Sequence, residues 1–295
     1  MTKTQLALKN AVYVARPNQS VVNIRFEGIR SGWKQRVLLT SDRHHDSTHC
    51  DRAMEKRHLD EAKASDAIVL DFGDLFDVMQ GRGDPRGSYS DIRPEYAKAN
   101  YLDLVVQEAK NFYKPYARNI VLLARGNHET RIAREKDTDI TDRLVSHLRD
   151  ESKDSHAIAG QYSGWVLFQF LSGKQESKRL YYNHGTGGES AATFGVGQIR
   201  KQTAFLDGVD FVVNGHSHHA YHVPMVAKGV SQNGAVYDKL IHGIRTPGYK
   251  RVFRDEHMGG FEVQSGHAPK PVGAVWLEFT YNNGDIESKV TVDVS

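Results

Sequence analysis

Short apolar runs alternate with longer amphipathic segments over most of the chain. The runs have the length and the β-branched or aromatic content typical of buried strands, and they lie at 37–40, 67–70, 120–124, 165–171, 179–182 and 211–213. Between them, the spacing of apolar residues predicts helices over 51–65, 95–113, 139–150 and 196–206. Strands separated by helices are typical of βαβ units, so we expect an α/β fold around a largely parallel sheet.

The two ends of the chain differ from this middle part. The dipeptide Asn283-Gly284 lies between WLEFTY and VTVDV and predicts a hairpin within a β-rich C-terminal part. We find no internal repeat and no long linker, so we expect a single domain with mixed sheets. Its parts in chain order are one or two edge strands in 1–35, a motif-bearing core in 36–219, and antiparallel strands of the same body in 220–295.

Composition narrows the class of protein. Among 295 residues, 39 Lys and Arg nearly balance 36 Asp and Glu, so no overall charge draws the chain to nucleic acid or lipid. Cys50 is the only cysteine, which excludes a disulfide framework and fits a reducing compartment. No apolar run approaches the roughly 18 residues of a membrane helix, so we expect a soluble, cytoplasmic protein without a membrane partner. The 15 histidines invite a metal or acid–base role.

Polar clusters follow five of the predicted strands directly. These clusters are Ser41–His44, Asp71–Asp77, Arg125–Glu129, Asn183–Gly185 and Asn214–His218. In open α/β sheets, ligands bind in the crevice beyond the carboxyl ends of the strands. We therefore expect these five segments to build one site.

The clusters supply oxygen and imidazole ligands in a number that suits two metal ions. Residues two apart in an extended strand end share a face, which pairs Asp42 with His44 and His216 with His218. The full candidate set is Asp42, His44, Asp74, Asn127, His184, His216 and His218. This set is too large for one tetrahedral site but suits two divalent ions that share a carboxylate, and Mn, Fe, Zn and Ni fit it about equally.

Two such ions would favour in-line displacement at phosphorus. They generate hydroxide near neutral pH and neutralise phosphoryl oxygens, so no Ser or Cys nucleophile is required. Asn127 and His128 are adjacent and should point in different directions. His128 would then lie at the rim as the general acid for the leaving oxygen, with a carboxylate fixing its tautomer.

The ordered motifs D-x-H, G-D-x-x-D, G-N-H-E, H and G-H-x-H resemble the calcineurin-like metallophosphoesterase superfamily over residues 42–218. The resemblance implies a four-layered α/β/β/α sandwich. It implies that Asp42, His44 and His218 bind one metal and that Asp74 bridges both. It also implies roles for the remaining motif residues, with Asn127, His184 and His216 on the second metal, His128 as proton donor and Asp77 orienting His128.

The subfamily features point away from protein phosphatases. Arg125–Glu129 is similar to the protein Ser/Thr phosphatases, but Val78 stands where those enzymes carry a phosphate-binding Arg. The pair His216 and His218 is more similar to bacterial phosphodiesterases and nucleases, and the chain also resembles phage-encoded members. We therefore expect hydrolysis of a phosphodiester, nucleotide or nucleic acid. Two alternatives stay open, a phosphomonoesterase and a catalytically silent metal-binding interaction protein.

Two long basic loops, 80–94 and 246–271, accompany these motifs. Loops of this length are often functional, so their cations are candidates for holding a substrate phosphate. The candidates are Arg82, Arg86, Arg245 and Arg251. The alternative for each is a solvated surface charge, which is the more common role of such residues.

Overall fold

The computed structural model describes residues 4–5, 13–78, 92–173, 175–187, 193–251, 253, 266 and 268–295. The helices are α1 (Arg52–Ala64), α2 (Tyr101–Tyr113), α3 (Asn127–Lys136), α4 (Ile140–Glu151) and α5 (Val196–Phe205), with 3-10 turns η2 (Pro94–Tyr96) and η3 (Lys114–Tyr116). The strands are β1 (Thr4–Gln5), β2 (Tyr13–Asn18), β3 (Val21–Phe26), β4 (Lys34–Thr40), β5 (Ile68–Asp71), β6 (Ile120–Leu123), β7 (Ile158–Ala159), β8 (Ser163–Leu171), β9 (Gln175–Asn183), β10 (Phe211–Asn214), β11 (Tyr221–Val230), β12 (Val236–Arg245), β13 (Gly273–Asn282) and β14 (Asp285–Val294).

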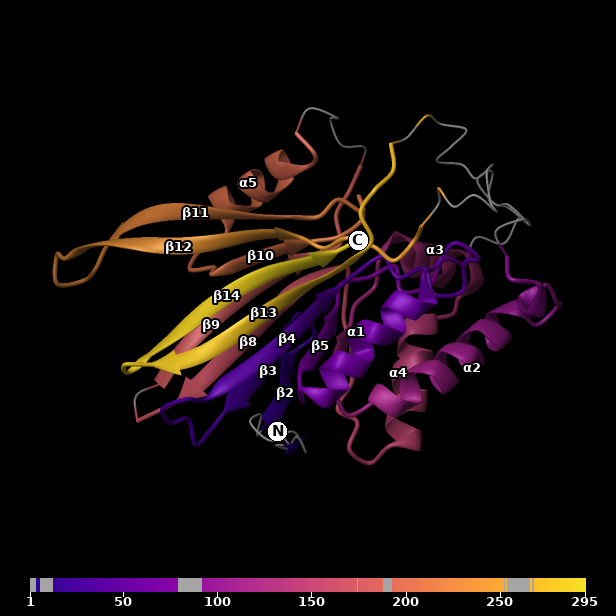
Figure 1. The fold of residues 1–295 in the computed structure, drawn as a ribbon, viewed down its shortest axis with the longest axis horizontal. Helices are drawn as coiled ribbons and strands as arrows, with labels where there is room; N and C mark the ends of the chain where they lie inside the picture. The colour runs from indigo at the N-terminus through magenta and orange to yellow at the C-terminus, as the bar shows by residue number, and fades with distance from the viewer. Residues whose placement is uncertain are drawn as a thin grey trace.

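The strands form two mixed sheets. One has the order β1-β2-β3-β8-β9-β10-β12-β11, and the other has the order β14-β13-β4-β5-β6-β7. Strands β4 to β7 are parallel, as are β9, β10 and β12, whereas β13 adds to β4 in antiparallel register. Figure 1 shows α1, α2 and α4 on one side of the molecule and α5 apart from them, with the β11–β12 hairpin projecting beyond β14.

Three apolar cores define four layers. The core between the sheets contains alternate residues of each strand, for example Ile24, Phe168 and Phe211 from one sheet and Val37, Leu39 and Phe279 from the other. Because strand side chains alternate between faces, Leu38 instead packs under α1, α2 and α4. On the outer face of the larger sheet, Ile199 of α5 packs with Val212. The structure is thus the α/β/β/α sandwich that the sequence predicts.

Most predicted elements are present, with four differences, the first of which is that the short strand β7 was not predicted. The N-terminal part forms three strands rather than one or two. The helix predicted over 95–113 is divided into η2 and α2. Helix α3 was not predicted, because its sequence NHETRIAREK is polar and begins inside a motif that suggested only a turn.

The predicted C-terminal hairpin is present. Asn282 pairs with Asp285, and Asn283 and Gly284 both adopt the positive φ that a two-residue hairpin turn requires. The β-rich segment 220–247 forms a second hairpin, β11 and β12. Among the described residues, no helix has the length and apolar content needed to cross a membrane.

Candidate metal centre

The five polar clusters meet where the two sheets adjoin. Asp42, Asp74 and Asn127 follow β4, β5 and β6 of one sheet, and His184 and the His216–His218 turn follow β9 and β10 of the other. Backbone hydrogen bonds hold these segments together. The amide of Asp42 donates to Gly73 O at 2.8 Å, and the amide of Gly215 donates to His184 O at 2.9 Å. The site therefore depends on the relative position of both sheets.

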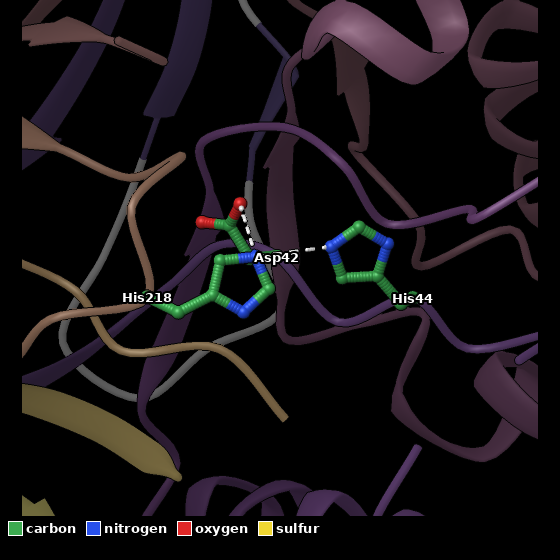
Figure 2. A group of neighbouring side chains, drawn as sticks. All are labelled: Asp42, His44 and His218. Carbon is green, nitrogen blue, oxygen red and sulfur yellow. Dashed lines mark hydrogen bonds and ion pairs between the residues drawn. The ribbon is translucent and has the colours of Figure 1, made fainter. Parts of the chain in front are cut away.

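The first group of side chains contains Asp42, His44 and His218 (Figure 2). His218 Nε2 lies 3.5 Å from Asp42 Oδ1 and 3.3 Å from His44 Nε2. The two imidazoles are stacked with centroids 5.1 Å apart. All three potential ligand atoms thus converge on one point, as a metal ion requires.

The second group contains Asp74, Asn127, His184 and His216. His184 Nε2 lies 3.0 Å from Asp74 Oδ2 and 3.1 Å from Asn127 Oδ1. His216 Nδ1 lies 2.8 Å from the same Asn127 oxygen. The other nitrogen of His184, Nδ1, is 3.0 Å from Phe72 O, so that carbonyl directs Nε2 toward the group.

Asp74 links the two groups, because its carboxylate also lies within 4.8 Å of ligand atoms of His44 and His128. Asp42 Oδ1 is a buried oxygen without a hydrogen-bond partner, and it lies 4.0 Å from His184 Nε2. A buried carboxylate oxygen without a partner is costly unless a cation satisfies it. The residues present therefore fit one or more divalent cations, with oxygen and imidazole as the ligands.

The charges of the group are strongly coupled. Burial alone would raise the pKa of Asp74, but His184 and His128 outweigh it and hold that pKa well below its usual range. Conversely, burial would lower the pKa of His184, but Asp74 raises it to about 10. Without a bound cation, the carboxylates therefore draw protons onto His184 and His128, whereas burial lowers the pKa of His216 and lowers that of His218 to about 3. A cation would replace those protons.

An unusual backbone conformation orients most of the candidate ligand side chains. Five of the seven adopt a positive φ, namely Asp42, His44, Asp74, His216 and His218. Positive φ is uncommon outside glycine and carries strain, although Asp and His tolerate it better than most residues. The expectation that residues two apart share the face of an extended strand is therefore right only for Asp42 and His44, which meet in a tight turn and not in a strand. His216 and His218 lie in different groups.

His128 lies beside both groups, at the start of α3. Its Nε2 is 3.7 Å from Asp74 Oδ2, and its Nδ1 is hydrogen-bonded to the backbone carbonyl of Asp77. Burial would lower the pKa of His128, but Asp74 and Asp77 outweigh burial and raise that pKa. A partly exposed imidazole that holds its proton can serve as a general acid.

Asp77 reaches His128 through its main chain rather than its carboxylate. Its Oδ1 lies 2.7 Å from His44 Nδ1 and 3.3 Å from Lys250 Nζ. The Asp77 carboxylate therefore orients His44, and its carbonyl fixes the tautomer of His128. Asp77 thus contacts His128, as predicted, but through its main-chain carbonyl and not through its carboxylate.

Two further carboxylates shape the loops and were not assigned from the sequence. Glu129 accepts from the amides of Gly126 at 2.8 Å, Phe76 at 2.9 Å and Asp74 at 3.1 Å. Asp46 accepts from the amide of Asp77 at 2.6 Å. Glu129 is the last residue of the motif G-N-H-E, and its place in that motif was the one sequence feature that could have identified it.

Glycines allow the loops to approach closely. A Cβ added at Gly126 would lie 2.0 Å from Asp74 Oδ1 and 2.5 Å from Asp74 N. One added at Gly215 would lie 2.6 Å from Asp42 Oδ2. At both positions, the absence of a side chain leaves room for a candidate metal ligand.

A buried ionic network lies under the first group. Arg43 donates to Asp71 Oδ2 at 2.6 Å and to Glu55 Oε1 at 3.0 Å, and His45 Nδ1 lies 2.8 Å from Glu55 Oε2. Burial would raise the pKa of Glu55, but His45 and Arg43 lower it to about 2. Cys50 also lies within reach of His45 and Glu55. Since Arg43 and His45 already occupy both Glu55 oxygens, we interpret this group as structural support for the Asp42–His44 turn.

The structure describes two of the four candidate phosphate-binding arginines, and both of these side chains bond to other parts of the protein. Arg245 is fully buried, and it donates to Gly215 O at 2.6 Å and to Gly195 O at 3.3 Å. Its burial is incompatible with the predicted contact to substrate. Arg251 donates to Asp51 Oδ2 at 3.1 Å and to Ser295 Oγ at 2.7 Å, neither of which is one of the seven candidate ligands. Arg82 and Arg86 lie outside the described residues.

Comparison with known proteins gives structural similarity at low sequence identity and no matching family. No protein-family model matches the chain, and no curated protein matches it. Among solved structures, Vps29 of Cryptosporidium parvum has a TM-score of 0.35 and 11% identity, with 89% of this chain and 100% of that chain covered. A Vps29 D62A mutant of Entamoeba histolytica has a TM-score of 0.29 and 10% identity, covering 88% and 99%. GAP50, the anchor in the inner membrane complex of Plasmodium, has a TM-score of 0.38 and 12% identity, covering 88% and 84%. Such low scores support no argument about chemistry.

Proposed function

We propose that this protein is a metal-dependent phosphoesterase with a dinuclear centre, acting on a phosphodiester or nucleotide. One observation carries the proposal. Asp74 joins two groups of ligand side chains at the carboxyl ends of the strands, since it lies with His184 and His216 and also within reach of His44, and His128 lies beside it. A buried arrangement of three carboxylate, amide or imidazole ligands per ion, joined by one carboxylate, suits the two-metal hydrolysis of phosphate esters.

In this proposal, Asp42, His44 and His218 hold one divalent ion, Asn127, His184 and His216 hold the other, and Asp74 holds both. When bound, such ions would activate water and neutralise charge on the phosphoryl oxygens.

The other residues position groups and move one proton. The carboxylate of Asp77 and the carbonyl of Phe72 fix the rings of His44 and His184. His128 then delivers the proton on Nε2 to the leaving oxygen while its Nδ1 stays bonded to Asp77 O.

The nearby side chains favour a diester over a phosphoprotein. Val78 is buried, so the position that carries a phosphate-binding Arg in the protein phosphatases presents an apolar side chain here. The side chain of Lys250 is only 12% exposed, and its ammonium group already pairs with the Asp77 carboxylate. A diester carries one negative charge on its phosphate group, so it needs less cationic support than a monoester dianion.

A hydrolysis assay tests the proposal. The metal-free chain is supplied with Mn, Fe, Zn or Ni and offered para-nitrophenyl phosphate, its bis ester and a nucleic acid. We expect metal-dependent turnover that is faster on the bis ester. Faster turnover of the monoester would favour a phosphomonoesterase. Silence on all three substrates would overturn the enzymatic proposal and favour a metal-binding interaction protein.

The variant Asp74→Asn tests the shared ligand. We expect it to lose both ions and all turnover, since the neutral amide bridges two cations poorly. Asp238→Asn is the matched control, because Asp238 pairs with Lys228 at a 59% exposed position on β12. Full retention of both metals and of activity in Asp74→Asn would refute the bridge.

A further inference from the structure

An aromatic pair connects the turn before α5 with the loop that carries His218. Phe194 and His219 have ring centroids 5.0 Å apart in an edge-to-face arrangement of 80°. His219 directly follows His218, one of the candidate ligands. Phe194 is 54% exposed, so half of a large apolar side chain faces solvent beside a polar site. Neither ring has a part in the chemistry described above.

The backbone of Phe194 is unusual. Its φ is 45°, in the left-handed region that a bulky residue rarely occupies. Among the described residues, the other non-glycine positions of this kind are Asp, Asn or His, apart from Val78. Strain of this type persists only where neighbours fix it, and it concentrates at functional sites.

Arg245 fixes the turn that carries Phe194. Its guanidinium donates to Gly195 O and to Gln198 Oε1, each at 3.3 Å, and to Gly215 O at 2.6 Å. One buried side chain thus ties the Phe194 turn to the loop that carries His216. The aromatic pair therefore has a fixed position relative to the candidate ligands.

Core packing does not explain this position. Phe194 is absent from the cores of the described residues, and the exposed valines and Leu240 of the β11–β12 hairpin lie on a different element. An isolated flat apolar ring is too small for a protein interface, which needs a contiguous patch. It does suit a single planar ligand group. Nucleobases stack on aromatic side chains, and they are joined to a phosphate that would lie at the neighbouring ligands.

We propose that Phe194 and His219 form a shelf that stacks the nucleobase of a nucleotide-type substrate. This inference rests on the proposed function, since it places the phosphate of that substrate at the candidate metal centre. Phe194 supplies the exposed ring face, His219 supports its edge, and Arg245 is a positioning residue.

The difference in affinity between AMP and ribose 5-phosphate isolates the contribution of the nucleobase to binding. Both ligands carry the same phosphate and sugar, and isothermal calorimetry on the metal-loaded full chain measures each affinity. All samples carry His128→Asn so that neither ligand is consumed. Stacking on an aromatic ring changes affinity by roughly 5-fold to 150-fold per base, and a half-exposed ring belongs at the lower end. We therefore expect AMP to bind about 5-fold to 20-fold more tightly than ribose 5-phosphate.

Phe194→Ala should reduce this preference to near unity, and Phe194→Trp should keep it. Phe205→Ala is the matched control, because Phe205 is 69% exposed at the other end of α5 and should not change the preference. A preference that survives in Phe194→Ala, or is absent from the parent, overturns the shelf. Diester hydrolysis without a base preference would refute only the shelf. A Phe194-dependent preference without hydrolysis would refute only the enzymatic proposal.

Discussion

Substitution of Gly126 by alanine should disturb the metal centre through a single methyl group. The new Cβ would lie 2.0 Å from Asp74 Oδ1, whereas real Cβ contacts stay above 3.0 Å. The carboxylate must therefore retreat by about 1 Å, since the interior is close-packed. Gly126 has φ −101° and ψ −162°, which alanine adopts freely, so the effect is steric and not conformational.

A displacement of this size exceeds what a metal site tolerates. Metal–ligand distances hold to within about 0.2 Å, so Asp74 can no longer join both ions in the same geometry. We expect metal affinity to fall by at least about 10-fold. Overpacking should also lower the free energy of unfolding by about 1–3 kcal/mol.

Elemental analysis after dialysis against a fixed free metal concentration measures the first effect, and thermal unfolding with and without metal measures the second. Gly197→Ala is the control, because no atom lies within 4 Å of its added Cβ and it is inside α5. That control should keep both metals and gain up to about 1 kcal/mol of stability. Two ions bound at wild-type affinity in Gly126→Ala would refute the shared position of Asp74.

Three further outcomes follow. His128→Asn should slow turnover by about 10²-fold to 10⁴-fold with both metals retained, and metal loss by elemental analysis would contradict a proton-donor role. Glu55 has its pKa lowered from 4.5 to about 2, so the folded state gains stability above pH 4.5 and loses about 3 kcal/mol as pH falls toward 2. Denaturant titrations should show this slope in the wild type and not in Glu55→Gln, and equal slopes would disprove it. Arg245→Met releases the Phe194 turn and also Gly215 O beside His216, so it should weaken AMP binding more than ribose 5-phosphate binding, and an equal loss for both would argue against its positioning of Phe194.

The sequence indicated the candidate ligands because two signals coincided. Short apolar runs marked β4, β5, β6, β9 and β10, and each run was followed within a few residues by Asp, Asn or His. Strand direction then required those ends to meet. No comparable signal existed for α3, because NHETRIAREK presents only Ile132 and Glu129 as buried side chains.

Roles that depend on distant main-chain atoms escaped prediction. Glu129 accepts from the amide of Phe76, 53 residues away, and Asp46 accepts from that of Asp77, 31 residues away. Contacts between residues this far apart in the chain produce no regular spacing that a sequence pattern could reveal. Arg245 was expected beside the loop 246–271 as a contact to substrate, but it ends β12 and pairs with Asn214 of the neighbouring β10. Its burial follows from the order of strands, which the sequence did not specify.

The left-handed backbone at Asp42, His44, Asp74, His216 and His218 has a consequence for protein engineering. Glycine at any of these positions would relax the turn, and a library selected only for thermal resistance should accumulate such changes. Each of them would delete a candidate ligand at the same time. Heat tolerance and chemistry are thus opposed at these turns, and a thermostable version of this scaffold must gain its stability elsewhere, for example on the exposed surface of its helices.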